Sequence, residues 1–173
     1  MNSRFLILFF ICLTCHILRS VYEILKYRKK ISPSNKIVFG FMFINMGALW
    51  TSWFMMCEND PVLLLLPAWL TFIGLAIFIA GILLFILTLI KMRTLDNYSG
   101  ELIEDGLFLI TRHPMYLGFI FWIIGYPVFQ QAQTSLFTSI IWILNILFWR
   151  KIEEMELESK YSNYIEYKKK TLF

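Results

Sequence analysis

Five apolar runs of nearly membrane-spanning length constrain the fold of this chain more than any other feature. They cover residues 4–25, 37–57, 62–90, 114–130 and 135–150. A helix needs about 20 apolar residues to cross the ~30 Å hydrocarbon core of a bilayer. In agreement, 58% of the 173 residues are apolar and only 16% are charged. The sequence therefore predicts an all-α integral membrane protein with about five transmembrane helices.

We expect a single membrane domain over residues 1–173, because nothing in the sequence separates two folding units. Its parts would be three transmembrane helices (1–91), a cytoplasmic loop (92–113), a short helical hairpin (114–150) and a cytoplasmic, interfacial tail helix (151–173). The first run could imitate a signal peptide, but no small-residue cleavage site follows it. A retained anchor is therefore expected.

Positive charge alternates from loop to loop and predicts how the helices are oriented. The segments after the first, third and fifth runs are basic, whereas those after the second and fourth contain no Lys or Arg. Because Lys and Arg are retained on the cytoplasmic side, we expect the N-terminus outside and the C-terminus in the cytoplasm. Topology and contact with anionic lipid account for the net charge of +4, so no nucleic-acid partner is expected.

Several reaction classes find no support in the sequence. Residues 12–16 match the C-x-x-C-H pattern of haem attachment, but they lie inside an apolar run, whereas attachment needs an exposed segment. The three cysteines are interpreted as small apolar residues. The sequence contains no phosphate-binding Gly-rich loop, H-E-x-x-H motif or G-x-S-x-G elbow. Only two histidines are present, so no metal site is predicted, and the chemistry is expected around His113.

Six of the eight glycines fall in pairs seven residues apart, which is almost two helical turns. Such pairs allow a neighbouring backbone to come close, so they predict helix packing. The pairs are Gly40 and Gly47, Gly74 and Gly81, and Gly118 and Gly125. Gly118 follows Tyr116 by two residues and could also admit a ligand.

A polar cluster, Arg112-His113, stands directly before the fourth apolar run. Pro114 suits the first position of a helix, since it has no N–H to leave unsatisfied and its φ is preset. The helix would direct free N–H groups and the positive end of its dipole towards Arg112 and His113. Together these groups predict a site for a carboxylate or phosphate. The alternative is that both side chains only reach lipid headgroups.

A second polar block, residues 153–158, follows the fifth run and contains four glutamates. On a helix, Glu153 and Glu154 point about 100° apart, so at most one of them can face a given pocket squarely. Glu154 and Glu158 share a face. Tyrosines at 161, 164 and 167 then recur every three residues, a spacing that suits an amphipathic interfacial helix. The alternative is a solvated acidic face followed by an aromatic belt.

The two blocks together favour a ligand that carries both charges. One block offers cationic and N–H groups to an anion, and the other offers carboxylates to a cation. Both are expected on the cytoplasmic side, at the two ends of the short hairpin. A zwitterionic amino-acid group fits between them.

These motifs resemble those of the isoprenylcysteine carboxyl methyltransferase and phospholipid methyltransferase superfamily of integral membrane enzymes. The pattern of that superfamily is Leu-Val-x-x-Gly, Arg-His-Pro-x-Tyr-x-Gly, a helical hairpin, Glu-Glu-x-x-Leu and Tyr-x-x-Tyr. This chain supplies the corresponding residues, in the same order, at 102–106, 112–118, 153–157 and 164–167. The resemblance covers about the C-terminal 75 residues.

The resemblance implies an S-adenosyl-L-methionine-dependent membrane methyltransferase of the EC 2.1.1 class. His113 and Tyr116 would hold the amino-acid end of the cofactor, and Arg112 would organise the corner of the site. One of the two adjacent glutamates would bind the ammonium group or fix the pocket. The implied cofactor-binding residues are Leu102, Ile103, Arg112, His113, Tyr116, Gly118, Glu153 and Glu154.

The resemblance further implies a lipophilic acceptor, isoprenylcysteine carboxylate-like or phospholipid-like, that enters from the bilayer between helices. No catalytic base is assigned, because the sulfonium of the cofactor is already activated. Two other functions stay open from the residues alone. Membrane sterol reductases share part of the His-Pro-x-Tyr region and use NADPH, although the paired glutamates favour a methyltransferase. A non-catalytic membrane scaffold would use both blocks as lipid-headgroup contacts.

Overall fold

A computed structural model of the chain describes residues 3–92 and 101–173, and its regular elements there are all helical. They are α1 (Ser3–Tyr27), α2 (Lys36–Glu58), α3 (Ala68–Met92), the 3-10 helix η1 (Gly106–Leu109), α4 (Pro114–Phe129), α5 (Gln133–Lys160) and α6 (Tyr164–Lys170). Helices α1, α2, α3 and α5 are long and apolar enough to cross a membrane, and α4 is a shorter apolar helix. The predicted all-α membrane fold is confirmed. Residues 93–100 of the predicted 92–113 loop lie outside the described residues.

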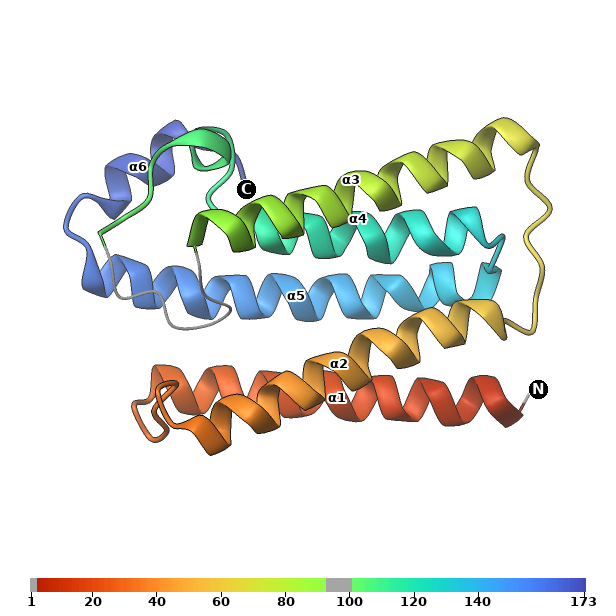
Figure 1. Cartoon of the computed structure of the whole chain (residues 1–173), viewed down its shortest axis with the longest axis horizontal. Helices are drawn as coiled ribbons and strands as arrows, with labels where there is room; N and C mark the ends of the chain where they lie inside the picture. The colour runs from red at the N-terminus through yellow and green to blue at the C-terminus, as the bar shows by residue number, and fades with distance from the viewer. Residues whose placement is uncertain (1–2, 93–100) are drawn as a thin grey trace.

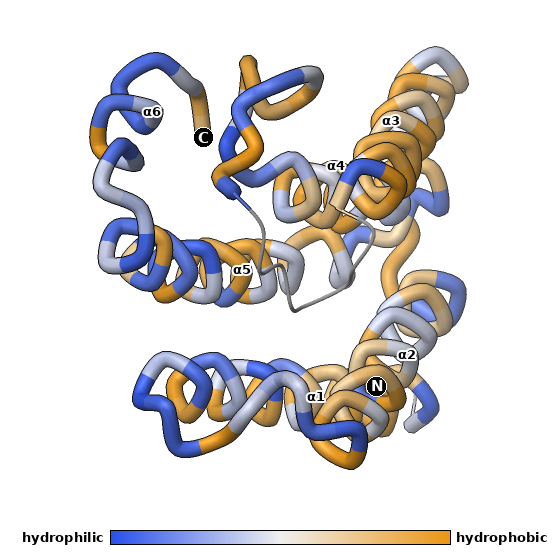
Figure 2. Tube along the Cα trace, turned by 60° about the vertical axis from the view of Figure 1, so that its left-hand side comes forward, coloured by the Kyte–Doolittle hydropathy of each residue, from blue (hydrophilic) through white to orange (hydrophobic). Residues whose placement is uncertain are grey.

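The apolar helices α1 to α5 run up and down along one axis (Figure 1). α2 packs on α1, α3 packs on α4, and α5 contacts both α1 and α4. Residues 28–35, the end of α3, the start of α4 and the end of α5 all lie at one end of the bundle, called the basic end below (Figure 1). Hydrophilic residues gather there in α6 and the adjoining part of α5, whereas α3 is largely hydrophobic (Figure 2).

Two helix boundaries differ from the expected spans. The third helix begins at Ala68 rather than at residue 62, because Pro67 disfavours helical backbone at the residue before it. The fifth helix continues past residue 150 to Lys160, because the acidic and basic residues that follow the apolar run are good helix formers. The predicted tail helix is consequently divided between the end of α5 and the separate α6.

The glycines of α3 and α4 bring these two helices into backbone contact, as predicted. A Cβ atom added at Gly81 would lie 2.6 Å from the carbonyl oxygen of Gly118, and one added at Gly125 would lie 2.7 Å from that of Gly74. Only glycine leaves room for this approach. The prediction is wrong for the α2 pair, because added Cβ atoms there would meet nothing within 4 Å.

A carboxylate fastens the opposite end of the bundle, which carries the 59–67 loop. Asp60 accepts hydrogen bonds from the backbone N–H of Thr134 (3.2 Å) and from the N–H and hydroxyl of Ser135 (2.6 and 2.7 Å). It thereby satisfies donors at the start of α5. Burial of the Asp60 carboxyl group favours its neutral form and raises its pKa. The hydrogen bonds from Thr134 and Ser135, together with one from the Val62 backbone N–H, outweigh this effect, so the pKa of Asp60 is lower than usual.

The histidine of the C-x-x-C-H pattern packs inside the bundle. The His16 ring stacks on Trp142 with 4.5 Å between centroids, and its Nδ1 lies 3.0 Å from Asn145 Oδ1. Cys12 and Cys15 are buried beside it on α1. Within residues 3–92 and 101–173, no group of three or more His, Cys, Asp or Glu side chains could hold a metal ion. The contacts of His16 join α1 to α5.

Replacement of Gly81 by alanine is expected to destabilise the protein. The added Cβ would meet the Gly118 backbone, and overpacking of this kind costs about 1–3 kcal/mol, or roughly 2–10 °C in Tm for a chain of this size. Thermal unfolding of purified Gly81→Ala in detergent measures the effect. Gly40→Ala is the matched control, since its Cβ has open space. Equal melting temperatures for the two variants would contradict the packing described here.

Candidate functional site

A cavity of about 380 Å³ lies at the basic end and is lined by residues from α1 to α6. Ligand pockets typically occupy about 300–1,000 Å³. Six of the eight residues predicted to bind a cofactor line this cavity: Leu102, Ile103, Arg112, His113, Tyr116 and Glu153. The structure thus brings together side chains from the segment before α4, from α4 itself and from α5.

Residues 102–109 form one wall of the cavity. Gly106 adopts a φ of 61°, which glycine tolerates without strain, and the chain then turns into η1. Phe108 is buried against Tyr164 and Tyr167 of α6. The Tyr167 hydroxyl donates to the Phe108 carbonyl oxygen at 2.6 Å, and burial raises the pKa of Tyr167 to about 12. The tyrosines of the predicted interfacial helix therefore point into the protein.

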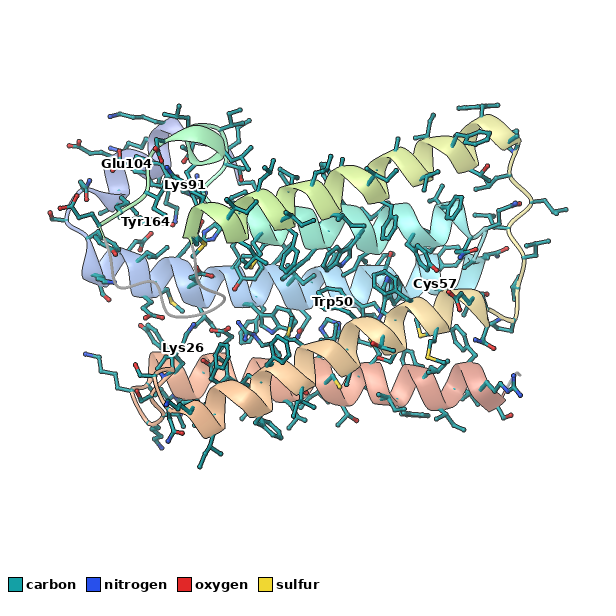
Figure 3. The ribbon with its side chains drawn as sticks, viewed as in Figure 1. Lys26, Trp50, Cys57, Lys91, Glu104 and Tyr164 are labelled. Atoms are coloured by element: carbon teal, nitrogen blue, oxygen red, sulfur yellow. The ribbon has the colours of Figure 1, made fainter. Side chains whose placement is uncertain are left out.

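Two contacts at the surface hold this wall to its neighbours, and Figure 3 labels one residue of each, Lys91 and Glu104. Lys91, near the end of α3, donates to Asp105 Oδ2 at 2.6 Å. Asn163, just before α6, donates to Glu104 Oε1 at 2.8 Å. The wall is therefore tied to a membrane helix on one side and to the tail on the other.

His113 lines the cavity and places its imidazole Nε2 against Glu154. Helix α4 begins at Pro114, as predicted, and His113 is its N-cap residue. The imidazole is 4% exposed, and its Nε2 lies 3.4 Å from Glu154 Oε1. The ring thus faces the Glu154 carboxylate in a contact too long for a regular hydrogen bond, and Nε2 has no other hydrogen-bond partner among the described residues.

Glu154 is the centre of an ionic cluster beside the cavity. Arg112 donates to Glu154 Oε1 from Nη2 at 3.1 Å and from Nε at 3.3 Å, and Lys168 donates to Oε2 at 3.0 Å. Lys168 also donates to Glu158 at 2.9 Å, so Glu154 and Glu158 share a face of α5, as predicted. The hydrogen bonds to Glu158 and Glu154 raise the pKa of Lys168.

Arg112 also holds the end of the chain against the site. Its Nη1 donates to the carbonyl oxygens of Thr171 (2.7 Å) and Lys168 (3.1 Å). Its backbone N–H donates to the Phe173 carbonyl oxygen at 3.0 Å, and the Leu172 N–H donates to Ile110 at 2.8 Å. Residues 171–173 therefore lie along residues 110–112. Residues 171–173 have no sequence signal for this position beyond the basic and aromatic residues of the tail.

The two adjacent glutamates have different surroundings, as their angular separation on a helix predicts. Glu153 lines the cavity, whereas Glu154 faces Arg112 and Lys168 beside it. Gly118 does not line the cavity: it contacts the α3 backbone at Gly81.

The chain matches the phospholipid methyltransferase family over residues 69–164, which is more than half of its length. It belongs to this family. Searches of curated proteins and of solved structures found no match. The matched range includes nearly all of α3, all of α4 and α5, and most of the cavity wall. Most of the residues that line the cavity of this membrane methyltransferase therefore lie in the part of the chain that matches the family.

The sequence did not predict three polar residues that line the cavity, Arg19, Lys26 and Tyr164. Arg19 and Lys26 line the cavity from α1, outside the matched range. Tyr164 is fully buried, and its hydroxyl has no hydrogen-bond partner among the described residues. An ionisable residue within an apolar run is the signal that could have identified Arg19. Burial of Tyr164 follows from tertiary packing, which its spacing alone does not reveal.

Replacement of Arg112 by lysine is expected to release the end of the chain. Lysine keeps the charge but lacks the planar fork that joins Glu154 to the carbonyl oxygens of residues 168 and 171. Hydrogen–deuterium exchange followed by mass spectrometry should show faster exchange in residues 168–173 of Arg112→Lys. Lys169→Gln, which alters an exposed residue of the same segment, should exchange as the native protein does. Unchanged exchange in Arg112→Lys would show that the arginine does not hold the tail.

Proposed function

We propose that this membrane methyltransferase uses S-adenosyl-L-methionine and transfers its methyl group to a lipophilic acceptor. The observation that carries the proposal is a cavity lined by His113, Tyr116, Glu153 and Tyr164, in which the buried Tyr164 hydroxyl has no hydrogen-bond partner among the described residues. Buried polar groups are normally satisfied, so a polar ligand is the natural partner for this hydroxyl. Family membership supports the same reaction class.

The lining residues fit the charge pattern of the cofactor. His113, Tyr116 and Tyr164 offer polar groups to its amino-acid end, and Glu153 offers a carboxylate to its ammonium group. Arg112 and Glu154 would act indirectly, since they hold the corner at which His113 lies.

Hydrophobic residues complete the proposed cofactor site. Leu102 and Ile103 are half-buried at the wall of the cavity and would contact the adenosyl part. Gly118 would contribute through the close approach of α4 to α3 that it permits.

The proposed reaction asks the protein for positioning and exclusion of water. S-adenosyl-L-methionine supplies a methyl group on a positively charged sulfur, which keeps the electron pair of the broken C–S bond while an acceptor lone pair forms the new bond. The aromatic rings of Trp50, Phe85 and Phe119 pack together at the cavity. They would keep water from the reacting atoms and hold the acceptor in line. No catalytic acid or base is assigned.

The acceptor is proposed to enter from the bilayer, as an isoprenylcysteine carboxylate-like or phospholipid-like molecule. The protein would be a multi-pass membrane protein with its N-terminus outside and with the basic end, including the cavity, in the cytoplasm. The gathering of the basic segments at one end of the bundle supports this orientation (Figure 1).

Binding of S-adenosyl-L-methionine by the purified protein tests the cofactor assignment. Calorimetry in detergent should detect binding by the native protein, and His113→Ala, Glu154→Ala and Tyr164→Phe should each weaken it by about tenfold or more, as expected for loss of a buried polar contact. Tyr27→Phe, at an exposed position of α1, should bind as the native protein does. Absence of binding, or binding of NADPH instead, would refute the assignment.

Labelling from one side of the membrane tests the orientation. Cysteines introduced as Lys169→Cys and Asn59→Cys lie at opposite ends of the bundle, and the three native cysteines are buried. A membrane-impermeant maleimide added to intact cells should label the variant at 59 and leave the variant at 169 unlabelled until permeabilisation. The reverse pattern would invert the topology.

A further inference from the structure

The loop at the end of the bundle opposite the basic end is apolar although it is not helical. Residues 61–90 contain no charged side chain, yet α3 begins only at Ala68. Residues 62–66, which we call the leucine loop, therefore precede the helix as an apolar segment of irregular backbone. None of them lines the cavity, so the proposed methyl transfer does not explain their composition.

The leucine loop runs past the ends of α4 and α5, and its backbone pairs with the turn between them (Figure 1). The Leu64 N–H donates to the Gln131 carbonyl oxygen at 2.7 Å, and the Leu66 N–H donates to the Gln131 side-chain oxygen at 3.3 Å. The Gln133 N–H donates to the Val62 carbonyl oxygen at 3.1 Å. These bonds satisfy part of the loop backbone, which lowers the cost of placing a non-helical chain in contact with lipid.

The side chains of the leucine loop are largely exposed. Leu63 and Leu65 are 64% and 83% exposed. A single exposed leucine is ordinary, but several in one short segment mark a contact surface. The exposure continues into the first turns of α3, where Trp69 and Phe72 are 62% and 67% exposed. Because α3 is long and apolar enough to cross a membrane, its exposed face contacts lipid, and the leucine loop directly precedes that face.

The length of α3 indicates the depth of the leucine loop in a bilayer. From Ala68 to Lys91, the first charged residue after the loop, the helix is about 35 Å long. The hydrocarbon core is about 30 Å thick, and the polar layers bring a bilayer to about 40–45 Å. With Lys91 at one boundary of the core, the loop falls in the interfacial layer at the other boundary. Trp69 is of the residue type enriched in that layer.

We propose that the leucine loop is a lipid-contact surface, from which Leu63 and Leu65 insert into the interfacial layer of the adjacent leaflet. Its backbone meanwhile covers the polar turn between α4 and α5. The partner is the bilayer itself, and not a second protein. This contact explains why a segment outside the helices is apolar, and it does not depend on the reaction that the protein catalyses.

Fluorescence quenching in phosphatidylcholine vesicles tests the contact with the full chain. Bimane is attached to Leu63→Cys or Leu65→Cys, which displace no buried side chain, and the three native cysteines are buried. A phosphatidylcholine with a nitroxide near the top of its acyl chain should remove most of the fluorescence at both positions. Asn59→Cys, in the same connection and next to Asp60, is the matched control and should lose little. Aqueous iodide should give the reverse order, although Leu65 is the more exposed residue within the protein.

A second lipid probe measures the depth of the loop. Ile79, near the middle of α3, is 47% exposed and serves as the reference position inside the hydrocarbon core. Bimane on Ile79→Cys should be quenched more by a nitroxide deep in the acyl chain than by one near its top. Bimane on Leu65→Cys should show the opposite preference, as expected for the interfacial layer.

Three results would overturn this assignment. Equal quenching of Leu65→Cys and Asn59→Cys by the lipid nitroxide would show that the loop does not enter the bilayer. Protection of Leu65→Cys from iodide without quenching by lipid would show that another protein covers the loop. Stronger quenching of Leu65→Cys by the deep nitroxide than by the shallow one would place the loop inside the hydrocarbon core and not at its boundary.

Discussion

The contact between Arg112 and Glu154 organises the basic end of the bundle. Arg112 belongs to the segment before α4, Glu154 belongs to α5, and the other donors of the arginine reach the carbonyl oxygens of the tail. Three parts of the chain that are distant in sequence therefore meet at one guanidinium. Loss of either partner would leave a charge in a largely buried position, which is costly. Arg112 thereby holds residues 168 and 171 beside the segment that carries His113.

The fold was largely predictable because membrane-spanning helices leave a strong signal in composition and run length. The helical structure of the apolar runs, Pro114 as the start of α4, and the glycine contact between α3 and α4 all follow from local sequence. The start of α3 was placed six residues too early, because apolar residues 62–67 resemble a helix until the effect of Pro67 is considered. The α2 glycines were misread because spacing alone does not identify a partner helix.

The candidate site was predictable only where its residues lie in recognisable motifs. Arg112, His113 and Glu153 were named from sequence, and the helical angle between adjacent residues correctly indicated that only one of the two glutamates would face the cavity. The α1 contribution was missed because it depends on how α1 packs against α5, through contacts such as that of His16 with Trp142. Contacts between helices that are distant in sequence have no local signature, so they appear only in the tertiary structure.

The shortness of α4 has a consequence for where the proposed chemistry would take place. A helix of 16 residues is about 24 Å long, whereas the hydrocarbon core of a bilayer is about 30 Å thick. If the C-terminal end of α4 reaches one boundary of the core, its first turn, with Tyr116, lies roughly 6 Å inside the opposite boundary. An acceptor would then meet the donor at the depth where its own headgroup joins its tail. It would not have to leave the lipid layer to be methylated.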